Sequence, residues 1–429
     1  MGCRRVVLGA VVLVGVATAA AGVGGGLPWP QAQAPDPSAH VARWLGDPAL
    51  RAALDGLEQA EPSLIDEQVA FTEIPAPPFG EQARAARLAL AFTQVGLKNV
   101  RTDAAGNVIG ERPGLSPRPN LVVAAHLDTV FPEGTDVRVR REGAILRAPG
   151  VADDGRGLAV LVGIARALER GRVHTPGTIT FVANVGEEGL GDLRGVKHLF
   201  ARELLGRIDA FVSIDGTGYG ITHVAVGSHR YRVTFRGPGG HSFGAFGTVN
   251  PVHALGRAVS RIADFEVPRS PRVTFNVGRV GGGTSINSIA YEAWFEIDMR
   301  SSDAAALGSI DASFRDAVDR AARDENERWE SGRLEVEVER VGDRPAGRTP
   351  ATAAIVQTAV AVNRAMGLPA DLGEGSTDAN IPISLGIPAI TIGGGGQSGG
   401  AHSLGESFDA TGSWKGTARA VALVFALAR

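Results

Sequence analysis

Histidines and carboxylates stand in this sequence where they could bind metal ions or move protons. They lie directly after short apolar runs or inside glycine-rich loops: His126, Asp128, Asp153, Glu187, Glu188, Asp215 and His402. The carboxyl ends of parallel strands meet at one edge of an open α/β sheet, and ligand-binding residues gather there. Imidazole nitrogens and carboxylate oxygens are donors that Zn²⁺ and similar ions accept. The set therefore predicts a metal site at one edge of a sheet.

Each of these residues also has an ordinary structural interpretation when it is taken alone. Asp153 stands just before a helical pattern and also fits a helix N-cap. Adjacent glutamates are usually a solvated surface pair, but Glu187 and Glu188 follow the strongly apolar run Phe181–Val185. Because the whole set contains only His, Asp and Glu, one shared metal site explains it better than separate surface roles do.

A serine-hydrolase pattern competes for part of this set. Residues 240–244 read G-x-S-x-G around Ser242, and Asp378 and His402 follow in the order of an α/β-hydrolase triad. That motif requires a strand, a sharp turn and a helix, whereas the next helical pattern begins only near Pro251. The serine interpretation also leaves the other acidic clusters unexplained, so we favour the metal site.

The elements that must position these residues alternate between strand and helix patterns. Short continuous apolar runs are typical of buried strands and occur at Leu121–Ala125, Thr178–Val185, Ala210–Ile214 and Ala389–Ile392. Helical periodicity is present at Ile65–Glu73, Gln82–Val95 and Leu158–Glu169. Strands that alternate with helices predict a three-layer α/β domain with parallel strands at its centre.

A different pattern begins near residue 227. Polar and apolar residues alternate at Tyr231–Arg236, Val273–Val277 and Ala293–Met299, and helical patterns occur at Val252–Ala263 and Ala304–Ala322. The order strand–helix–strand–strand–helix–strand, ending near Glu339, predicts an α+β insert with a half-solvated antiparallel sheet. A chain of 429 residues is long enough for one α/β domain interrupted by this smaller one.

The composition limits the kinds of partner and of chemistry. With 44% hydrophobic and 21% charged residues, the chain is typical of a globular protein. Its net charge of −3 gives no support to a nucleic-acid partner, which usually requires a basic excess. Cys3 is the single cysteine, which excludes an internal disulfide framework and a cysteine-based metal site.

Residues 1–34 are predicted to be a signal peptide. Two arginines precede an apolar stretch that ends at about Ala21, and Ala32–Ala34 offers small residues for cleavage. The stretch is shorter than the roughly 20 residues of a membrane-spanning helix. The paired arginines also permit twin-arginine export. We expect an exported protein, periplasmic or extracellular, and the alternative is an uncleaved membrane anchor.

Several motifs occur in order along the chain: AHLDTV at 125–130, VADDGRG, VGEEGLG, SIDG, GPGGHS, GSTDAN and GGAHSLGE. This ordered set resembles the M20 metallopeptidase family, with its tripeptidase-like branch nearest, over roughly residues 60–425. The resemblance implies a three-layer, zinc-exopeptidase-like catalytic domain with an inserted α+β (ferredoxin-like) lid that mediates dimerisation. The predicted boundaries are 40–226 and 341–429 for the catalytic domain and 227–340 for the lid.

The resemblance also implies two Zn²⁺ ions per subunit, or Co²⁺ or Mn²⁺ in their place. The implied metal ligands are His126, Asp153, Glu188, Asp215 and His402. Asp153 would bridge the two ions. His126 and Asp215 would complete one site, and Glu188 and His402 would complete the other.

Further residues match positions of the family that act on the substrate. Glu187 would be the general base, and Asp128 would orient the first histidine ligand by accepting its free ring N–H. In the lid, His241 would reach the partner's active site to stabilise the oxyanion. Asn287 and Arg300 would bind the substrate's carboxylate, for which an arginine fork is well suited.

We therefore predict a dizinc hydrolase of amide bonds in small peptides, a di- or tripeptide exopeptidase that acts as a homodimer. An N-acyl-amino-acid deacylase or a carboxypeptidase of the same family is the alternative enzyme. An exported peptide-binding protein, or a catalytically inactive relative, is the alternative without catalysis. Many relatives carry a lysine two residues after the bridging aspartate, where this chain has Gly155-Arg156, and this departure weakens the choice of branch.

Overall fold

The computed structural model describes residues 37–429. The predicted signal peptide, residues 1–34, lies outside the described residues, and export therefore stays a prediction. Within residues 37–429, none of the helices combines the length and the hydrophobicity that a membrane span requires.

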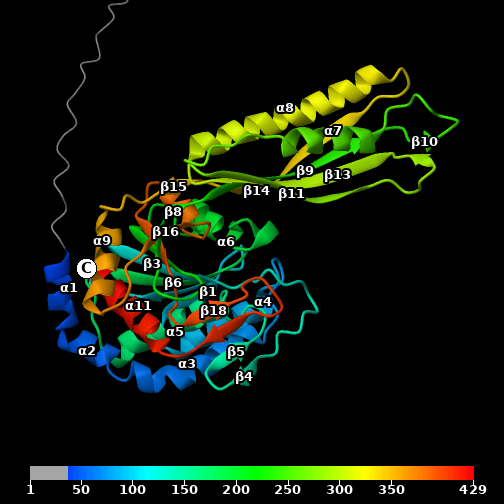
Figure 1. Ribbon diagram of the computed structural model, residues 1–429. Coiled ribbons are helices and arrows are strands. Elements are labelled where there is room, and N and C mark those ends of the chain that lie inside the picture. Colours follow the sequence, from blue (N-terminus) through cyan, green and yellow to red (C-terminus); the bar gives the residue numbers. More distant parts are fainter. Residues whose placement is uncertain (1–36) are drawn as a thin grey trace, which may run out of the picture. The chain divides into compact units, whose positions relative to one another are not determined.

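A nine-stranded mixed sheet lies at the centre of the larger α/β part of the fold (Figure 1). Its order is β1-β2-β6-β3-β7-β17-β8-β15, and β16 pairs with β8. Strands β6, β3, β7 and β17 run parallel to one another, as their continuous apolar runs predict. The strands are β1 (Lys98–Thr102), β2 (Val108–Arg112), β3 (Asn120–His126), β6 (Thr178–Asn184), β7 (Ala210–Ile214), β8 (Ile221–Ala225), β15 (Gly347–Arg348), β16 (Leu372–Gly375) and β17 (Ala389–Ile392).

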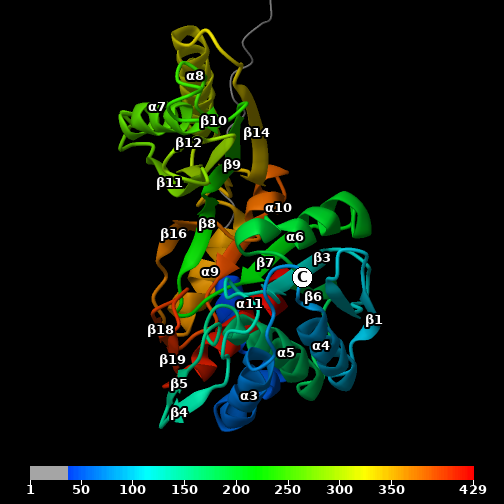
Figure 2. The ribbon, with the colours of Figure 1, turned by 90° about the vertical axis from the view of Figure 1, so that its right-hand side faces the viewer.

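Helices cover both faces of this sheet (Figures 1 and 2). On β3, Leu121 and Val123 face one core, while Val122 and Ala124 face the other. The first core receives α2 (Pro48–Leu54), α3 (Leu57–Thr72), α4 (Gln82–Gln94), α5 (Gly155–Arg170), α9 (Ala354–Ala365) and α11 (Trp414–Leu427), with α1 (Ser38–Leu45) outside α9 and α11. The second receives α6 (Arg194–His198), η2 (Leu199–Glu203) and α10 (Asn380–Ser384). The predicted three-layer architecture is confirmed.

A small four-stranded sheet joins two loops that are far apart in the sequence. Its order is β18-β19-β5-β4, and it pairs residues 145–147 with residues 407–409. The strands are β4 (Arg140–Glu142), β5 (Ile145–Arg147), β18 (Gln397–Gly399) and β19 (Ser407–Asp409). The segment that follows β5 is thereby brought beside the loop between β18 and β19.

The insert contains an antiparallel sheet of its own, in the order β11-β13-β9-β14. Its elements are β9 (Gly227–Arg236), β10 (Gly240–His241), α7 (Pro251–Ala263), β11 (Val273–Gly282), β12 (Ser288–Ile289), β13 (Glu292–Ser301), α8 (Ala304–Arg328) and β14 (Glu335–Arg344). The predicted order of strands and helices is confirmed, and β14 continues past the predicted end at Glu339.

The alternating pattern of the insert divides its sheet into an apolar and a charged face. On β9, Tyr231 and Val233 belong to the core that α7 and α8 cover (Figures 1 and 2). Arg232 lies between them, faces the other way and pairs across strands with Glu296 at 2.8 Å. The predicted half-solvated sheet is therefore present, while the exact domain boundaries stay a prediction. We refer to residues 227–344 as the lid.

Candidate functional site

The carboxyl ends of three neighbouring parallel strands meet at the candidate site. β3 ends with His126, which lies opposite Asn184 at the end of β6, shortly before Glu187. Asp215 directly follows β7, which pairs with β3 on its other side. The parallel register thus brings together residues that are up to about 90 positions apart, because equivalent ends of parallel strands lie at the same edge.

The loop before α5 adds Asp153 to this edge. Asp154, not Asp153, is the N-cap of α5, and its carboxylate accepts a hydrogen bond from the Gly157 N–H at 3.0 Å. The other oxygen of Asp154 accepts from the backbone N–H of His126 at 3.1 Å. The capping role considered for Asp153 therefore belongs to its neighbour, and the Asp153 carboxylate is directed to the histidines.

Asp153 lies between the two predicted histidine ligands. Its Oδ1 is 3.0 Å from His126 Nε2, and its Oδ2 is 3.1 Å from His402 Nε2. His402 Nε2 is also 3.0 Å from an oxygen of Glu188. Three groups have donor atoms within 4.8 Å of one another: His126–Asp153–Asp215, His126–Glu187–Glu188 and Asp153–Glu188–His402. All five predicted metal ligands are in these groups.

The charges in this cluster shift the pKa values of its members strongly. Burial opposes ionisation of Asp153, but hydrogen bonds from His126 and His402 hold its pKa well below the ordinary value. The contacts of His402 with Asp153 and Glu188 raise its pKa to about 10. Burial among like charges raises the pKa of Asp215 to about 7. The cluster therefore attracts positive charge, here carried by the histidines.

Glu187, the predicted general base, is buried and paired with an arginine that the sequence analysis did not identify. Arg344 Nη1 lies 2.8 Å from Glu187 Oε1, and Arg344 Nη2 donates to the Glu187 carbonyl. Burial raises the pKa of Glu187 well above its ordinary value, although the charge of Arg344 opposes this. Arg344 is the last residue of β14, so a lid strand supplies the counter-charge of this carboxylate.

Asp128 contacts the site differently from the prediction. His126 Nδ1 lies 3.0 Å from the backbone carbonyl of Asp128, whereas the Asp128 carboxylate is 3.8 Å away, too far for a hydrogen bond. The carboxylate instead accepts from the backbone N–H groups of Glu187 at 2.9 Å and Glu188 at 2.8 Å. Asp128 therefore orients His126 through its main chain and the two glutamates through its side chain.

The predicted lid residues occupy two separate places. β10 pairs with β12, so His241 lies beside Asn287, whose carbonyl accepts from Ser242 N–H. His241 Nδ1 accepts from the N–H groups of Phe243 and Gly244 at 3.2 and 3.3 Å. Arg300 lies near the opposite end of β13, where its Nε donates to Asp298 at 2.6 Å. The structure therefore keeps Arg300 apart from the other two.

The serine-triad pattern is not assembled among the described residues. Asp378 is buried and accepts a hydrogen bond from Asn184 at 2.7 Å. His402 contacts the carboxylates of Asp153 and Glu188. No hydrogen bond within residues 37–429 joins either of them to the Ser242 hydroxyl, so these three residues do not form a serine triad in this structure.

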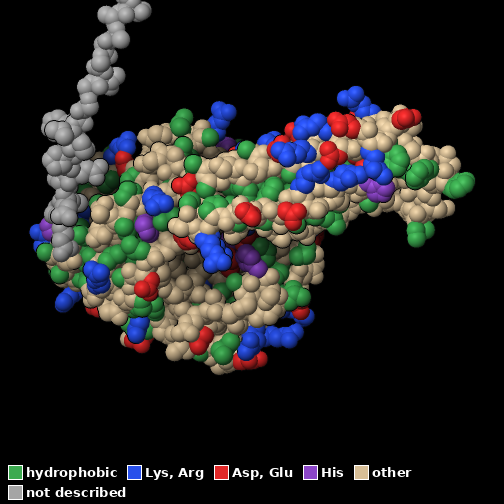
Figure 3. Space-filling view, turned by 45° about the horizontal axis from the view of Figure 1, so that its top comes forward, with side chains coloured by type: hydrophobic (Ala, Val, Ile, Leu, Met, Phe, Trp, Pro, Cys, Tyr) green, Lys and Arg blue, Asp and Glu red, His purple; other side chains and the backbone are tan. Residues whose placement is uncertain are grey.

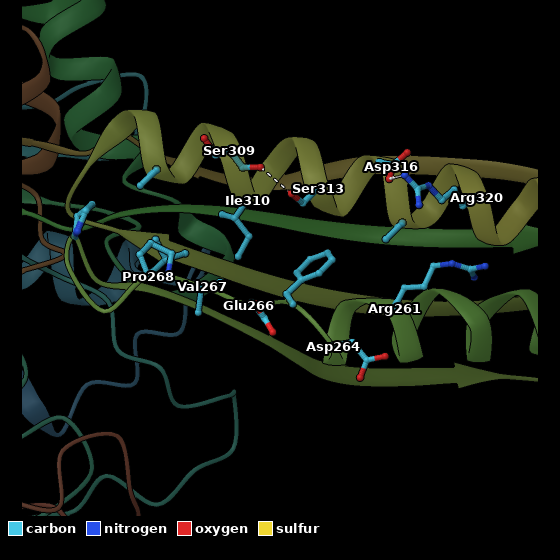
Figure 4. Close-up of a pocket in the computed structure, with 15 residues that line it drawn as sticks. Arg261, Asp264, Glu266, Val267, Pro268, Ser309, Ile310, Ser313, Asp316 and Arg320 are labelled. Atoms are coloured by element: carbon cyan, nitrogen blue, oxygen red, sulfur yellow. Dashed lines mark hydrogen bonds and ion pairs between the residues drawn. The ribbon is translucent and has the colours of Figure 1, made fainter.

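A large cavity in the lid is separate from this cluster. It has a volume of about 690 Å³ and lies between α8 and the segment after α7 (Figure 4). Its lining contains none of the predicted site residues. Arg300 and Ser376 are among the residues that line a smaller cavity of about 290 Å³. The Ser376 hydroxyl accepts from Arg344 at 3.2 Å, which links this cavity to Glu187 through two contacts.

Two residues that hold the site together carry no local signal in the sequence. Arg344 ends an ordinary alternating strand, and Glu406 ends the GGAHSLGE motif, in which only the histidine suggested a function. Glu406 is buried and accepts hydrogen bonds from the loop that carries Asp153. A buried role for an arginine or a glutamate depends on neighbours distant in the sequence, so only the assembled fold reveals it.

Histidine and carboxylate groups at the carboxyl ends of the parallel strands of a mixed α/β sheet suit the class of metal-dependent hydrolases. The chain belongs to peptidase family M20/M25/M40, whose model matches residues 122–427. The protein is therefore an enzyme of the metallopeptidase or amidohydrolase type, as the resemblance predicted.

Individual proteins are similar to this chain in part of the sequence or in fold. Carboxypeptidase G2 from Pseudomonas sp. (strain RS-16) is 34% identical over 101 residues, a stretch that covers 23% of this chain and only 24% of that protein. A tripeptidase from Staphylococcus aureus has a similar structure, with a TM-score of 0.70 at 23% identity over 86% of this chain and 99% of its own. A dinuclear metal-binding M20 peptidase from Bacillus subtilis gives 0.62 at 16% identity, covering 86% and 99%.

The Arg344–Glu187 pair leads to a prediction about stability. Arg344→Gln leaves a buried carboxylate without its counter-charge, so we expect the free energy of unfolding to fall by about 3–5 kcal/mol. The control Arg340→Gln removes an exposed pair with Asp343 and should cost at most about 1 kcal/mol. Urea unfolding of both metal-free variants measures the difference, and equal losses would contradict the importance of the buried pair.

Proposed function

We propose that this protein hydrolyses an amide bond in a small peptide, as an exported homodimer with two divalent metal ions, most simply Zn²⁺, in each subunit. The main support is that the Asp153 carboxylate belongs to two donor groups, with a different histidine on each of its oxygens. A carboxylate that belongs to both groups is well placed to bridge two metal ions.

The residues present fit two metal ions. His126, Asp153 and Asp215 would hold one, and Asp153, Glu188 and His402 the other. The donors are imidazole nitrogens and carboxylate oxygens, and the excess of carboxylates favours positive charge at this place. Such ions, when bound, lower the pKa of a water molecule and polarise the scissile carbonyl. The Bacillus subtilis relative is a dinuclear metal-binding peptidase, which agrees with this proposal.

Glu187 is the proposed general base. Its neighbour Glu188 contacts His402, so the two glutamates divide the tasks of binding metal and moving a proton. Glu187 accepts the proton of the attacking water and passes it to the leaving amine. Arg344 keeps Glu187 oriented through one hydrogen bond to its carboxylate and another to its backbone carbonyl.

The cavity beside Arg300 is the proposed binding place for the substrate's carboxylate. Its lining contains two arginines, Arg272 and Arg300, against one acidic residue, Glu374. Ser376, also in the lining, contacts the arginine that holds Glu187. An arginine fork binds a carboxylate in a defined orientation. Small peptides and N-acyl-amino acids both carry such a group, so deacylation remains the second candidate. The tripeptidase and the carboxypeptidase among the relatives favour peptides.

The end of the lid that carries β10 supports the proposed dimer. Phe243, Phe246 and Ile286 are strongly exposed there, and Figure 3 shows hydrophobic side chains gathered at this end. Exposed apolar patches of this kind often mark protein interfaces. Our proposal is that His241 and Asn287, which lie in the same region, complete the active site of the partner subunit.

The proposed metal centre predicts the outcome of metal removal. The purified mature protein should contain about two metal ions per subunit and should cleave di- or tripeptides. Chelation should abolish cleavage, and added Zn²⁺ should restore it. Elemental analysis measures the metal content, and a panel of dipeptide, tripeptide and N-acyl-amino-acid substrates measures the cleavage before and after chelation. If the protein neither binds metal nor cleaves any of these substrates when Zn²⁺ is supplied, the result would instead favour a peptide-binding protein.

Glu187→Gln tests the general base. We expect kcat to fall by about 10²–10⁴-fold, since the amide cannot accept the proton, while the metal content is unchanged. The matched control is Glu203→Gln, because Glu203 is a partly exposed carboxylate paired with Arg101. Its kcat should equal that of the wild type. Loss of metal together with activity in Glu187→Gln would argue for a ligand rather than a base.

A mixture of two variants tests the role of His241 across the dimer. His241→Ala should remain folded and metal-loaded but turn over slowly. When it is refolded in equal amounts with Glu187→Gln, about a quarter of the wild-type activity should appear, because half of the dimers are mixed and each has one complete site. A mixture as inactive as its components would show that His241 does not act in the partner's site.

A further inference from the structure

One glutamate receives most of the hydrogen bonds from the loop that carries Asp153. Glu406 Oε1 accepts from the N–H groups of Ala152 at 2.8 Å and Asp153 at 3.1 Å, and Oε2 accepts from Gly150 at 3.0 Å. The Glu406 carbonyl accepts from Ala148 at 3.2 Å. Four backbone N–H groups within residues 148–153 therefore donate to a single residue.

Glu406 is also the anchor of the loop that carries His402. All residues from 397 to 405 are exposed, and Glu406 is the first buried residue after them. His402 itself has a left-handed backbone, with φ of 63°, which costs energy for a non-glycine residue and persists only where its surroundings enforce it. The adjoining turns run from Gly400 through Ser403 to Glu406, whose N–H donates to the Ser403 carbonyl at 3.1 Å.

The charge of Glu406 has no side-chain partner in the described part of the chain. The residue is 1% exposed, and the hydrogen bonds of its carboxylate come only from backbone N–H groups. No Lys, Arg or His within residues 37–429 forms an ion pair with it. A buried carboxylate is costly unless it is hydrogen-bonded, and nearby positive charge reduces the cost further. The carboxylate of Glu406 also lies near that of Asp153, the residue proposed to bridge two cations.

We infer that Glu406 is a positioning residue for the metal centre, which sets Asp153 and His402 at the separation that binding of the cations requires. This inference rests on the proposed function, because it concerns the same two ligands. The side chain of Glu406 fixes the loop of Asp153, and its backbone ends the loop of His402. The pairing of β19 with β5 brings the two loops side by side, and the hydrogen bonds of Glu406 add a direct connection between them at the position of the ligands.

Zinc affinity of the folded protein tests the inference apart from activity. Glu406→Gln retains the size of the side chain but turns an NH₂ group toward a backbone N–H. We expect its Kd for Zn²⁺, measured by competition with a chromophoric chelator, to rise by at least about ten-fold. The control Glu142→Gln changes an exposed carboxylate on strand β4 that pairs with Arg147, and it should bind Zn²⁺ like the wild type.

A second variant separates position from charge. Glu406→Asp keeps the charge but is shorter by one methylene and cannot reach all three N–H groups, so its zinc affinity should also fall. Wild-type affinity in folded Glu406→Asp would attribute the effect to charge and overturn the positioning role. Wild-type affinity in folded Glu406→Gln would overturn the inference whatever the change in melting temperature. Absence of Zn²⁺ binding by the wild type would instead remove the proposed function itself.

Discussion

Repulsion among carboxylates at one edge of the sheet is the constraint on which this structure depends. Asp153, Asp215, Glu187 and Glu188 converge there, and burial raises the pKa values of Asp215 and Glu187. Such a cluster is tolerable only with compensating positive charge. In the described part of the chain the compensation comes from His126, His402 and Arg344. The proposed metal ions would supply it more fully, so the need for stability and the proposed chemistry point to the same place.

Backbone N–H groups provide the second means of holding this charge. Asp128 accepts from the N–H groups of both glutamates, Asp154 accepts from that of His126, and Glu406 accepts from the loop of Asp153. Each of these carboxylates belongs to one segment and binds the backbone of another. The result is that loops from distant parts of the sequence are fixed relative to one another without additional charged side chains.

The lid is connected to the candidate site by the ends of its strands. Arg344 at the end of β14 binds Glu187, and Arg230 on β9 donates to the Gly189 carbonyl at 2.7 Å. The backbone N–H of Asp343 donates to Asp192 at 2.9 Å. All three contacts reach the segment 187–192, which carries the proposed base. Any movement of the lid strands relative to this segment would therefore change the surroundings of Glu187.

The sequence alone determined the central parallel strands, the pattern of the lid and most of the candidate site. Continuous apolar runs predicted the parallel strands β3, β6, β7 and β17, and alternation predicted the half-solvated sheet of the lid, because each pattern follows from which faces are buried. Positions after strands or in glycine-rich loops predicted that the histidines and carboxylates would meet, and the family resemblance singled out His126, Asp153, Glu188, Asp215 and His402 as ligands. The structure brings these five together. What the tertiary structure alone decided is which buried groups satisfy one another. Three contacts are examples: Arg344 pairs with Glu187, Glu406 accepts from the loop of Asp153, and the carbonyl of Asp128, rather than its carboxylate, contacts His126. Such contacts depend on the packing of segments far apart in the chain, and no local pattern of residues encodes them.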